Sequence, residues 1–484
     1  MIASKKLKMK LNKFIIVLLS LPFSGLITYS YMGGGISSYD SGLYHLHTVE
    51  TIKKDFFWIG LGNLHDRLAF NNSNFYLIAF IEKFFPNIKS YYVFNPLAYF
   101  SLITYLLYQI LHYKNKSIFQ LIYFSIPLLI LSKEPLFIVS TSPDTISYCI
   151  GIFLFTEIIV IQRITKKNYL IYFFIYFILV TVKVSSIFYG LVFLPFLSKN
   201  FKNLNFLHLI LLSTIVFLPW VIRSIVISGY IIYPILPLPF IDIPWKIPSE
   251  TGDMHRAVIK YWAISSGKDY REIFNTPFYK WVPVWYHFWS KNNIHGSMQL
   301  FHFYKIGISL FIVAFSLSIL ILKSNYLFKN FEIKNLSVYT FILFVINLFW
   351  FFSAPDPRFS YASLIVFVAL LFSFSLGLAF SILKNFSIRI DKKCIVLFFI
   401  INLFYWNSMN WQRLENIKLD ATIPSPPVVK KVTNYGVEVL VPTLNDQCWK
   451  IALNCTPYFN PKLAYWDKEK KYGYKVEKDH YGKK

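Results

Sequence analysis

The sequence has few charged residues, and acidic residues are the scarcer kind. Of its 484 residues only 15% are charged, with 24 Asp and Glu against 49 Lys and Arg, and 55% are hydrophobic. Because about 25% of the residues in a soluble globular chain are charged, this composition excludes that class. Apolar runs of about 18 or more residues recur, and each is long enough to cross a hydrocarbon core of about 30 Å. The sequence therefore predicts an all-α polytopic membrane protein.

Several catalytic motifs are also absent. The chain has no P-loop, no nucleophile elbow, no HExxH zinc helix and no dinucleotide-binding fingerprint. These absences argue against an ATP-driven pump and against a hydrolase of the soluble type.

Cysteine is scarce too, with four residues in the chain. Cys149 and Cys394 lie in or beside apolar runs, where a free cysteine behaves as a small hydrophobic residue. Cys448 and Cys455 lie in the polar last 70 or so residues, the sequence around them being DQCWKIALNCTPY. If this tail is exported, we expect a disulfide between them. A zinc site is disfavoured, because no second Cys or His pair lies nearby.

The basic residues determine the expected topology. Short lysine clusters alternate with the apolar runs, which is typical of cytoplasmic loops and of contact with anionic lipid. This distribution indicates that the net charge of +25 serves contact with the lipid bilayer, and we expect no nucleic-acid partner. The first apolar segment, from about Leu11 to Met32, is too long for a signal-peptide core, so we interpret it as a retained span.

The apolar runs predict about 11 transmembrane helices. With the N-terminus in the cytoplasm, the basic clusters are all cytoplasmic if 169–197 forms a hairpin with Lys183 near its turn. The C-terminus is then external, and 1–411 is a transmembrane domain with external loops at 32–90 and 224–300, followed by a small exported tail at 412–484. The second of these loops is expected to contain a helix around 252–274. The expected spans are 12–31, 91–112, 118–138, 146–162, 169–182, 184–197, 206–223, 302–322, 337–353, 360–384 and 394–411.

The first external loop holds an unusual number of titratable residues. It is expected to contain an interfacial helix at 40–54 and a second interfacial or re-entrant helix at 74–85. Asp40 is expected to be an N-cap or a functional acid, namely a general base or a metal-binding carboxylate, and the two roles are compatible. His47 and Glu50 have the spacing for a shared metal, although a histidine at the interface without a metal is the commoner case.

Further along the same loop, GLGNLHDR contains several hydrogen-bonding side chains. Arg67 is suited to holding a phosphate, and Asn63 or His65 to contacting sugar hydroxyls or phosphate oxygens. The alternative is a solvated loop with an arginine–lipid contact. Tyr44 and His45, which follow Asp40, are also candidates for binding a substrate.

Two short external turns belong with this loop by topology. The first contains Asp144 in the sequence SPD, and the second contains Asp356 and Arg358 in APDPR. With Lys183, these turns place further acids and bases on the same side as Asp40. Because ionisable residues at membrane depth are costly, such a group predicts a functional site. Arg223, Asp253, His255 and Arg256, in or near the second loop, are weaker candidates.

The position of the acid resembles that of the GT-C class of membrane glycosyltransferases, in which the first external loop carries an essential acid and interfacial helices. Nearly the whole chain also resembles an uncharacterised family of bacterial inner-membrane proteins, often encoded among surface-polysaccharide genes, through the segments SYDSGLYHLHTVETIKK, GLGNLHDRLAFN, SPD, APDPRFS and DQCWKIALNCTPYFNP.

The GT-C resemblance implies a sugar donor on polyprenyl phosphate, a glycan or lipid acceptor, and chemistry at the periplasmic face of the inner membrane. Asp40 matches the catalytic acid, which would deprotonate the acceptor or help to bind a divalent metal ion. The commonest GT-C motif has two neighbouring acids, whereas Asp40 stands alone in YDSG.

We therefore expect a membrane glycosyltransferase with Asp40 as base and with Arg67, Lys183 and Arg358 neutralising the donor phosphate. One alternative is a polysaccharide flippase or transporter, which would need charged residues at several depths of the bilayer. Another is an O-antigen polymerase, with which the loop at 224–300 is compatible. A structural assembly protein is the remaining alternative.

Overall fold

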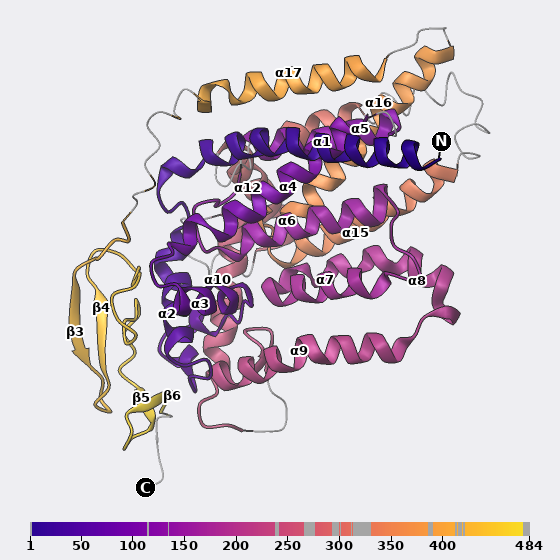
Figure 1. Cartoon of the computed structure of the whole chain (residues 1–484). Coiled ribbons are helices and arrows are strands. Elements are labelled where there is room, and N and C mark those ends of the chain that lie inside the picture. Colours follow the sequence, from indigo (N-terminus) through magenta and orange to yellow (C-terminus); the bar gives the residue numbers. More distant parts are fainter. Residues whose placement is uncertain are drawn as a thin grey trace.

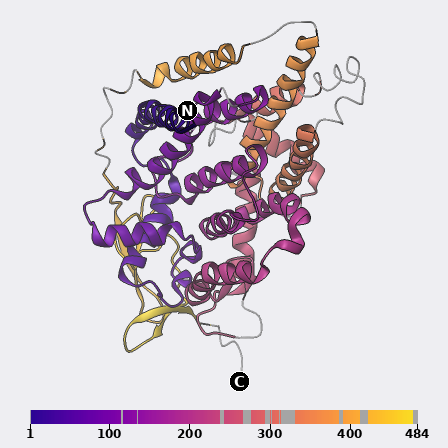
Figure 2. The ribbon, with the colours of Figure 1, turned by 45° about the vertical axis from the view of Figure 1, so that its right-hand side comes forward.

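The long helices lie roughly side by side, and the short helices between residues 41 and 84 gather with the C-terminal strands at one end of them (Figures 1 and 2). This computed structural model describes residues 2–113, 116–133, 135–237, 242–265, 276–292, 300, 302–310, 312, 331–385, 391–411, 414, 419 and 422–477.

Most of the described chain is helical. The α-helices are α1 (Ile2–Ser30), α2 (Leu46–Lys54), α3 (Asn74–Phe84), α4 (Phe94–Leu111), α5 (Ile118–Lys133), α6 (Pro143–Phe155), α7 (Tyr169–Val182), α8 (Leu194–Asn200), α9 (Phe206–Ser228), α10 (Ser249–Ile264), α12 (Phe278–Lys291), α15 (Phe331–Ser353), α16 (Tyr361–Asn385) and α17 (Lys392–Trp411). The strands are β1 (Tyr230–Ile232), β2 (Leu236–Pro237), β3 (Val428–Val432), β4 (Glu438–Pro442), β5 (Leu463–Asp467) and β6 (Tyr472–Val476).

Many of these helices suit a membrane. Among the described residues, four helical segments are long and apolar enough to cross one: Ser90–Leu111, Pro143–Val160, Val184–Asn203 and Phe206–Ser228. Shorter apolar helices include Ile118–Lys133, Tyr169–Val182 and Tyr361–Gly377. Helix α5 is apolar on all sides, is buried from residue 121 to 132 and packs on α4, α16 and α17, as expected of a helix at the centre of a bundle.

One predicted span has a different local structure. The run 184–197 was expected to be a membrane helix, but its first part is a 3-10 helix (Val184–Phe193) that leads into α8. Tyr176 donates a hydrogen bond to the carbonyl oxygen of Ile187 at 2.6 Å and packs against Gly190, where a Cβ atom would lie 2.5 Å from its hydroxyl. The Tyr176 hydroxyl thus binds the carbonyl oxygen of Ile187, which in a regular α-helix accepts a hydrogen bond from a backbone N–H.

Two other predictions are tested only in part. Of the span expected at 302–322, residues 311 and 313–322 lie outside the described residues. The helix expected around 252–274 is present as α10, which ends at Ile264, and 266–274 lie outside the described residues.

The first loop, at 32–90, is built from short helices. A π-helical turn (Ser41–His45) leads directly into α2, and α3 follows after two short 3-10 turns, Leu61–Asn63 and Asp66–Ala69. Buried apolar side chains of this loop, including Leu43, Leu64 and Phe75, form the larger part of a second hydrophobic core beside that of the long helices.

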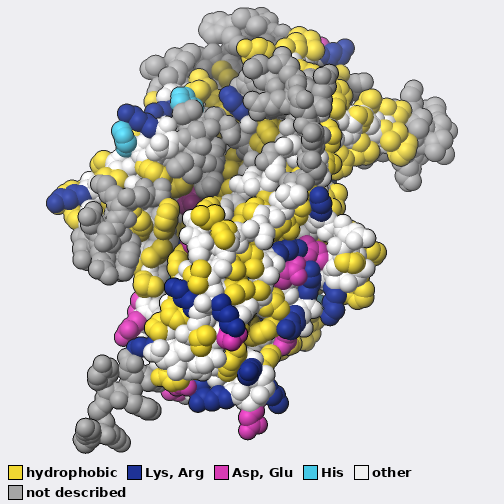
Figure 3. All heavy atoms as spheres, turned by 90° about the vertical axis from the view of Figure 1, so that its left-hand side faces the viewer, with side chains coloured by type: hydrophobic (Ala, Val, Ile, Leu, Met, Phe, Trp, Pro, Cys, Tyr) yellow, Lys and Arg dark blue, Asp and Glu magenta, His cyan; other side chains and the backbone are white. Residues whose placement is uncertain are grey.

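The tail completes this second core. Strands β3 and β4 form one antiparallel hairpin and β5 and β6 another, and these strands were not predicted from the sequence. Val437, Val439 and Leu463 lie in the same core cluster as Leu43 and Phe75, so the tail packs directly on the first loop. Seen from this end in Figure 3, Lys, Arg, Asp and Glu side chains lie among apolar ones.

Candidate functional site

Asp40 immediately precedes the π-helical turn and is bound by two arginines. Its Oδ1 accepts a hydrogen bond from Arg67 Nη1 at 3.2 Å, and its Oδ2 accepts one from Arg358 Nη1 at 3.0 Å. The Asp40 side chain makes no capping hydrogen bond to the helix that follows it. The interpretation of Asp40 as an N-cap is therefore wrong. π-helical turns are rare and occur frequently at functional sites.

The arginines keep this carboxyl ionised. Burial alone would raise the pKa of Asp40, but the charge of Arg358, followed by the neighbouring His45 and then by Arg67, holds it below the usual value of 3.8. Both carboxylate oxygens are engaged, so Asp40 holds the two guanidinium groups in place in this state.

The turn that carries Arg358 is organised by its own acid. The Asp356 carboxylate accepts a hydrogen bond from the backbone N–H of Arg358 at 3.0 Å and caps the short 3-10 helix Pro357–Phe359. The same carboxylate lies 2.7 Å from Arg358 Nε. Burial would lower the pKa of Arg358, but the charges of Asp356 and Asp40 raise it, so the guanidinium stays charged.

A third cation joins from the break between α7 and the following 3-10 helix. Lys183 forms an ion pair with Asp144, and the two side chains are only 10% and 9% exposed. Asp144 lies in the first turn of α6, where its backbone N–H donates to Ser142 Oγ. Lys183 Nζ also donates to the carbonyl oxygen of Arg358 at 3.1 Å, which joins this pair to the turn that carries Arg358.

The structure thus brings together six of the predicted residues, which we call the charge cluster: Asp40, Arg67, Asp144, Lys183, Asp356 and Arg358. They come from the first loop, from α6, from the end of α7 and from the turn between α15 and α16. Three acids balance three bases. Because a buried charge is costly unless it is paired, this balance lets the cluster persist at the edge of an apolar helix bundle.

Tyr44 and His45 lie next to this cluster. Their rings contact one another at 4.4 Å between centroids. Burial raises the pKa of Tyr44, and burial lowers the pKa of His45 to about 4, so both side chains are neutral at pH 7. His45 Nδ1 is buried and has no hydrogen-bond partner among the described residues.

Asn63 lies elsewhere and has a structural role. Its Nδ2 donates to the carbonyl oxygen of Trp245 at 2.8 Å and to that of Tyr474 at 3.3 Å. It therefore ties the first loop to the second loop and to the tail. The 3-10 turn Leu61–Asn63 directs the Nδ2 atom toward these backbone acceptors, and the contact of Asn63 with sugar hydroxyls or phosphate oxygens stays a prediction.

The remaining histidines of the first loop pair with other groups. His47 Nε2 is 3.2 Å from the carbonyl oxygen of Leu453, while Glu50 forms ion pairs with Lys53 and Lys450. His65 Nε2 lies 3.5 Å from Asp66 Oδ1, and Asp66 Oδ2 is hydrogen-bonded to Nδ1 of His255.

A divalent metal ion does not fit the charge cluster in this state. Both oxygens of Asp40 face guanidinium groups, and Asp144 faces an ammonium group. Within the described ranges, no three His, Cys, Asp or Glu side chains are grouped so as to hold a metal ion.

An apolar groove of about 770 Å³ runs between α2, α3, α6 and α7. It is lined by side chains such as Ile52, Phe80 and Ile146, together with Lys53 and Val182. Two of these helices also carry the charge cluster, since Ile146 follows Asp144 by two residues and Val182 precedes Lys183. The groove and the charge cluster are thus neighbours along the same two helices.

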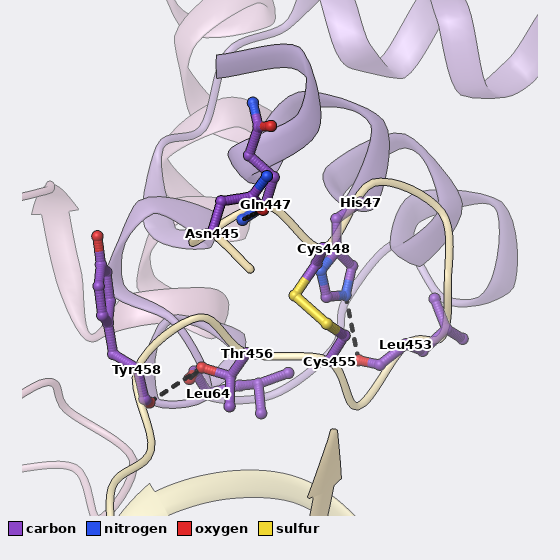
Figure 4. The surroundings of a disulfide bond; sticks show 9 residues. All are labelled: His47, Leu64, Asn445, Gln447, Cys448, Leu453, Cys455, Thr456 and Tyr458. Carbon is purple, nitrogen blue, oxygen red and sulfur yellow. Dashed lines mark hydrogen bonds between the residues drawn. A yellow bond between two sulfur atoms is a disulfide. The ribbon is translucent and has the colours of Figure 1, made fainter. Parts of the chain in front are cut away.

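The tail closes over the segment that contains Asp40. Cys448 and Cys455 form a disulfide, whose surroundings are shown in Figure 4. The backbone N–H of Trp449 donates to the carbonyl oxygen of Gly42 at 2.8 Å, and Gln447 Nε2 donates to that of Tyr39 at 2.7 Å. The tail therefore binds the backbone on both sides of Asp40.

Sequence reasoning missed two features of this region. The tail contacts made by Gln447 and Trp449 were not predicted, although the glycine in YDSG was a signal. A Cβ atom on Gly42 would lie 2.5 Å from the Trp449 ring, so this position requires the small residue. The pairing of His255 with Asp66 joins residues 189 positions apart, and no local pattern signals it.

No curated protein matches the chain. A family described as a domain of unknown function (DUF8201) matches residues 2–365, which is more than half of the chain and includes the whole charge cluster. The chain therefore belongs to the DUF8201 family.

Proposed function

We propose that this protein is a GT-C-type membrane glycosyltransferase, with 11 spans and a cytoplasmic N-terminus, at the periplasmic face of the bacterial inner membrane. It transfers a sugar from a polyprenyl-phosphate donor to a glycan or lipid acceptor during surface-polysaccharide assembly. The observation that carries the proposal is the charge cluster, in which three cations converge beside an apolar groove on α6 and α7.

The groove and the cations match the two chemically distinct halves of such a donor. A polyprenyl chain is apolar and resides in the bilayer, and the groove is lined mainly by apolar side chains from helices of the bundle and the first loop. An arginine guanidinium group can donate two parallel hydrogen bonds to a phosphate. Arg67 and Arg358 already direct their Nη1 atoms toward one carboxylate.

The phosphate would replace the Asp40 carboxylate as the partner of the two arginines. Asp40 would then lose the positive charges that lower its pKa, and burial would raise that pKa. A carboxylate with a raised pKa is a better general base. Donor binding would thus increase the proton affinity of Asp40.

The transfer step follows from these roles. The acceptor oxygen attacks the anomeric carbon while its proton moves to Asp40. The bond between the anomeric carbon and the phosphate oxygen breaks, and its electron pair stays on the phosphate. Arg67, Arg358 and Lys183 stabilise the negative charge that develops there.

Purified protein tests this proposal with a pool of sugar donors on polyprenyl phosphate and the Asp40→Asn variant. We expect transfer by the wild type and a loss of about 10²–10⁴-fold in turnover for the variant, as for removal of a general base. Asp467→Asn, a change in the exposed tail hairpin, is the matched control and should retain activity.

Equal activity of Asp40→Asn and the wild type would remove Asp40 from the mechanism. If no sugar is transferred but lipid-linked oligosaccharide crosses the bilayer of proteoliposomes, the protein is a transporter.

A further inference from the structure

Several buried polar atoms around Asp66 have no hydrogen-bond partner among the described residues. They are Nδ1 and Nε2 of His65, Oδ1 of Asp66, the hydroxyl of Tyr233 and Nε2 of His255, and of these only His65 Nε2 and Asp66 Oδ1 face each other, at 3.5 Å. His65, Tyr233 and His255 are only 3%, 6% and 4% exposed. Because at least about 90% of buried polar groups in proteins are hydrogen-bonded, a group of such atoms indicates a ligand site.

These residues come from both external loops. His65 and Asp66 belong to the first loop, Tyr233 follows β1 and His255 lies on α10 in the second loop. Phe70 joins them, since its ring lies 6.1 Å from Tyr233 and 5.2 Å from His255. We call His65, Asp66, Tyr233 and His255 the inter-loop site.

The charges at this site favour a neutral ligand with hydroxyl groups. Burial lowers the pKa of His65 to about 3, so its ring is neutral and offers one donor and one acceptor. Burial would raise the pKa of Asp66, but the hydrogen bond and charge of His255 lower it, so Asp66 is an ionised acceptor. Because the ionised Asp66 can only accept, the hydrogen of this bond lies on Nδ1 of His255, and Nε2 of the same ring has no partner among the described residues.

The inter-loop site adjoins the charge cluster through consecutive residues. Asp66 turns toward His255, and the next residue, Arg67, turns toward Asp40. The Phe70 ring also contacts Tyr44, at 5.7 Å, on the side of the charge cluster. A molecule held at the inter-loop site would therefore be a neighbour of one held by the charge cluster.

We infer that the inter-loop site binds hydroxyl groups of the saccharide acceptor, so that the two external loops together form the acceptor subsite. Buried acceptors and donors on rigid side chains, beside the aromatic rings of Phe70 and Tyr458, suit a sugar, which is polar at its rim and apolar on its faces. This inference rests on the proposed function and adds the part of the site that recognises the acceptor.

Tyr233→Phe is the sharpest test because it removes only one hydroxyl, which has no partner in the described structure. The full-length protein in lipid nanodiscs is assayed with labelled hexosyl undecaprenyl phosphates as donors and a lipid-linked oligosaccharide extract as acceptor. Transfer to the extract is measured together with hydrolysis of the donor, in which water is the acceptor.

We expect Tyr233→Phe and His255→Gln each to lower kcat/KM for the acceptor by about tenfold or more, as for loss of a buried substrate hydrogen bond. The donor KM and donor hydrolysis should not change, because the charge cluster is intact. Tyr99→Phe is the control, since it removes a buried hydroxyl that bonds to the carbonyl oxygen of Leu131 and belongs to neither the inter-loop site nor the charge cluster, and it should leave the acceptor constant unchanged.

The outcomes separate this inference from the proposed function. If the wild type transfers sugar and Tyr233→Phe has an unchanged acceptor constant, the acceptor subsite lies elsewhere and the proposed function stands. If the wild type transfers no sugar from any donor, both fail. His255→Gln supplies a second measurement, and its unfolding temperature shows whether a loss reflects binding or folding.

Discussion

Removal of the disulfide should release the tail from the Asp40 segment. The two cysteines are seven residues apart, and closing a loop of about eight residues restricts the unfolded tail by roughly 2.5 kcal/mol in the chain-entropy relation. Since every 1.4 kcal/mol is about a tenfold change in an equilibrium constant, local opening of the tail should become about 60-fold more frequent in Cys448→Ser/Cys455→Ser.

Hydrogen–deuterium exchange measures this opening directly. The amide of Trp449 bonds to the carbonyl of Gly42, and the amide of Thr456 bonds to that of Leu440, so both report on the docked tail. We expect their exchange to rise up to about 60-fold, with no change in α4 and α5. Cys394→Ser is the control, because this free cysteine is exposed on α17.

A second perturbation reaches the same contact from the other side. Gly42→Ala places a Cβ atom 2.5 Å from the Trp449 ring, and overpacking of this kind costs about 1–3 kcal/mol. It should raise exchange at the same amides with the disulfide intact. Equal exchange in the wild type and both variants would refute the idea that the tail clamps the Asp40 segment.

Two further predictions concern buried charge. Lys183→Met should destabilise the protein by about 3–5 kcal/mol, because it leaves Asp144 buried and unpaired, and Asp144→Leu added to it should recover most of the loss; the midpoint of denaturant unfolding measures both. Burial lowers the pKa of His45 and His47 to about 4 and of His65 to about 3, so these imidazoles take up protons at mildly acidic pH only on unfolding. Stability should therefore be full above pH 6.5 and fall as the pH drops toward about 4, with a shallower fall in His47→Gln. An unfolding temperature that stays constant between pH 7 and 4.5 would contradict this.

The long apolar runs were enough to predict where most helices lie. A run such as 206–223 has little alternative to a helix in a bilayer, because every backbone group must be bonded within the segment, and α9 covers this run. Local exceptions escaped the pattern. In 184–193 a backbone carbonyl oxygen accepts a hydrogen bond from Tyr176 of the neighbouring helix α7, and hydropathy contains no information about such a contact.

The charge cluster was predictable for a related reason. Ionisable residues at the ends of apolar runs are costly, so Asp144, Lys183 and Arg358 stood out once the topology put them on one side. The same reasoning gave His255 only as a weaker candidate and did not find Tyr233. Both lie in a long loop where polar residues are ordinary, and only the packing of one loop on the other shows that they meet Asp66.

The pairing within the charge cluster indicates which residue a bound phosphate would change. Asp144 would remain paired with Lys183. Asp356 would still accept the hydrogen bond from the backbone N–H of Arg358, which does not involve the guanidinium group. Asp40 has no such second partner in the described structure, since its two hydrogen bonds both come from arginines. In the proposed mechanism a phosphate that recruits both arginines therefore leaves one acid of the three unpaired and buried. The chemistry of the cluster thus depends on Asp40, although both of its oxygens are paired with arginines before the donor arrives.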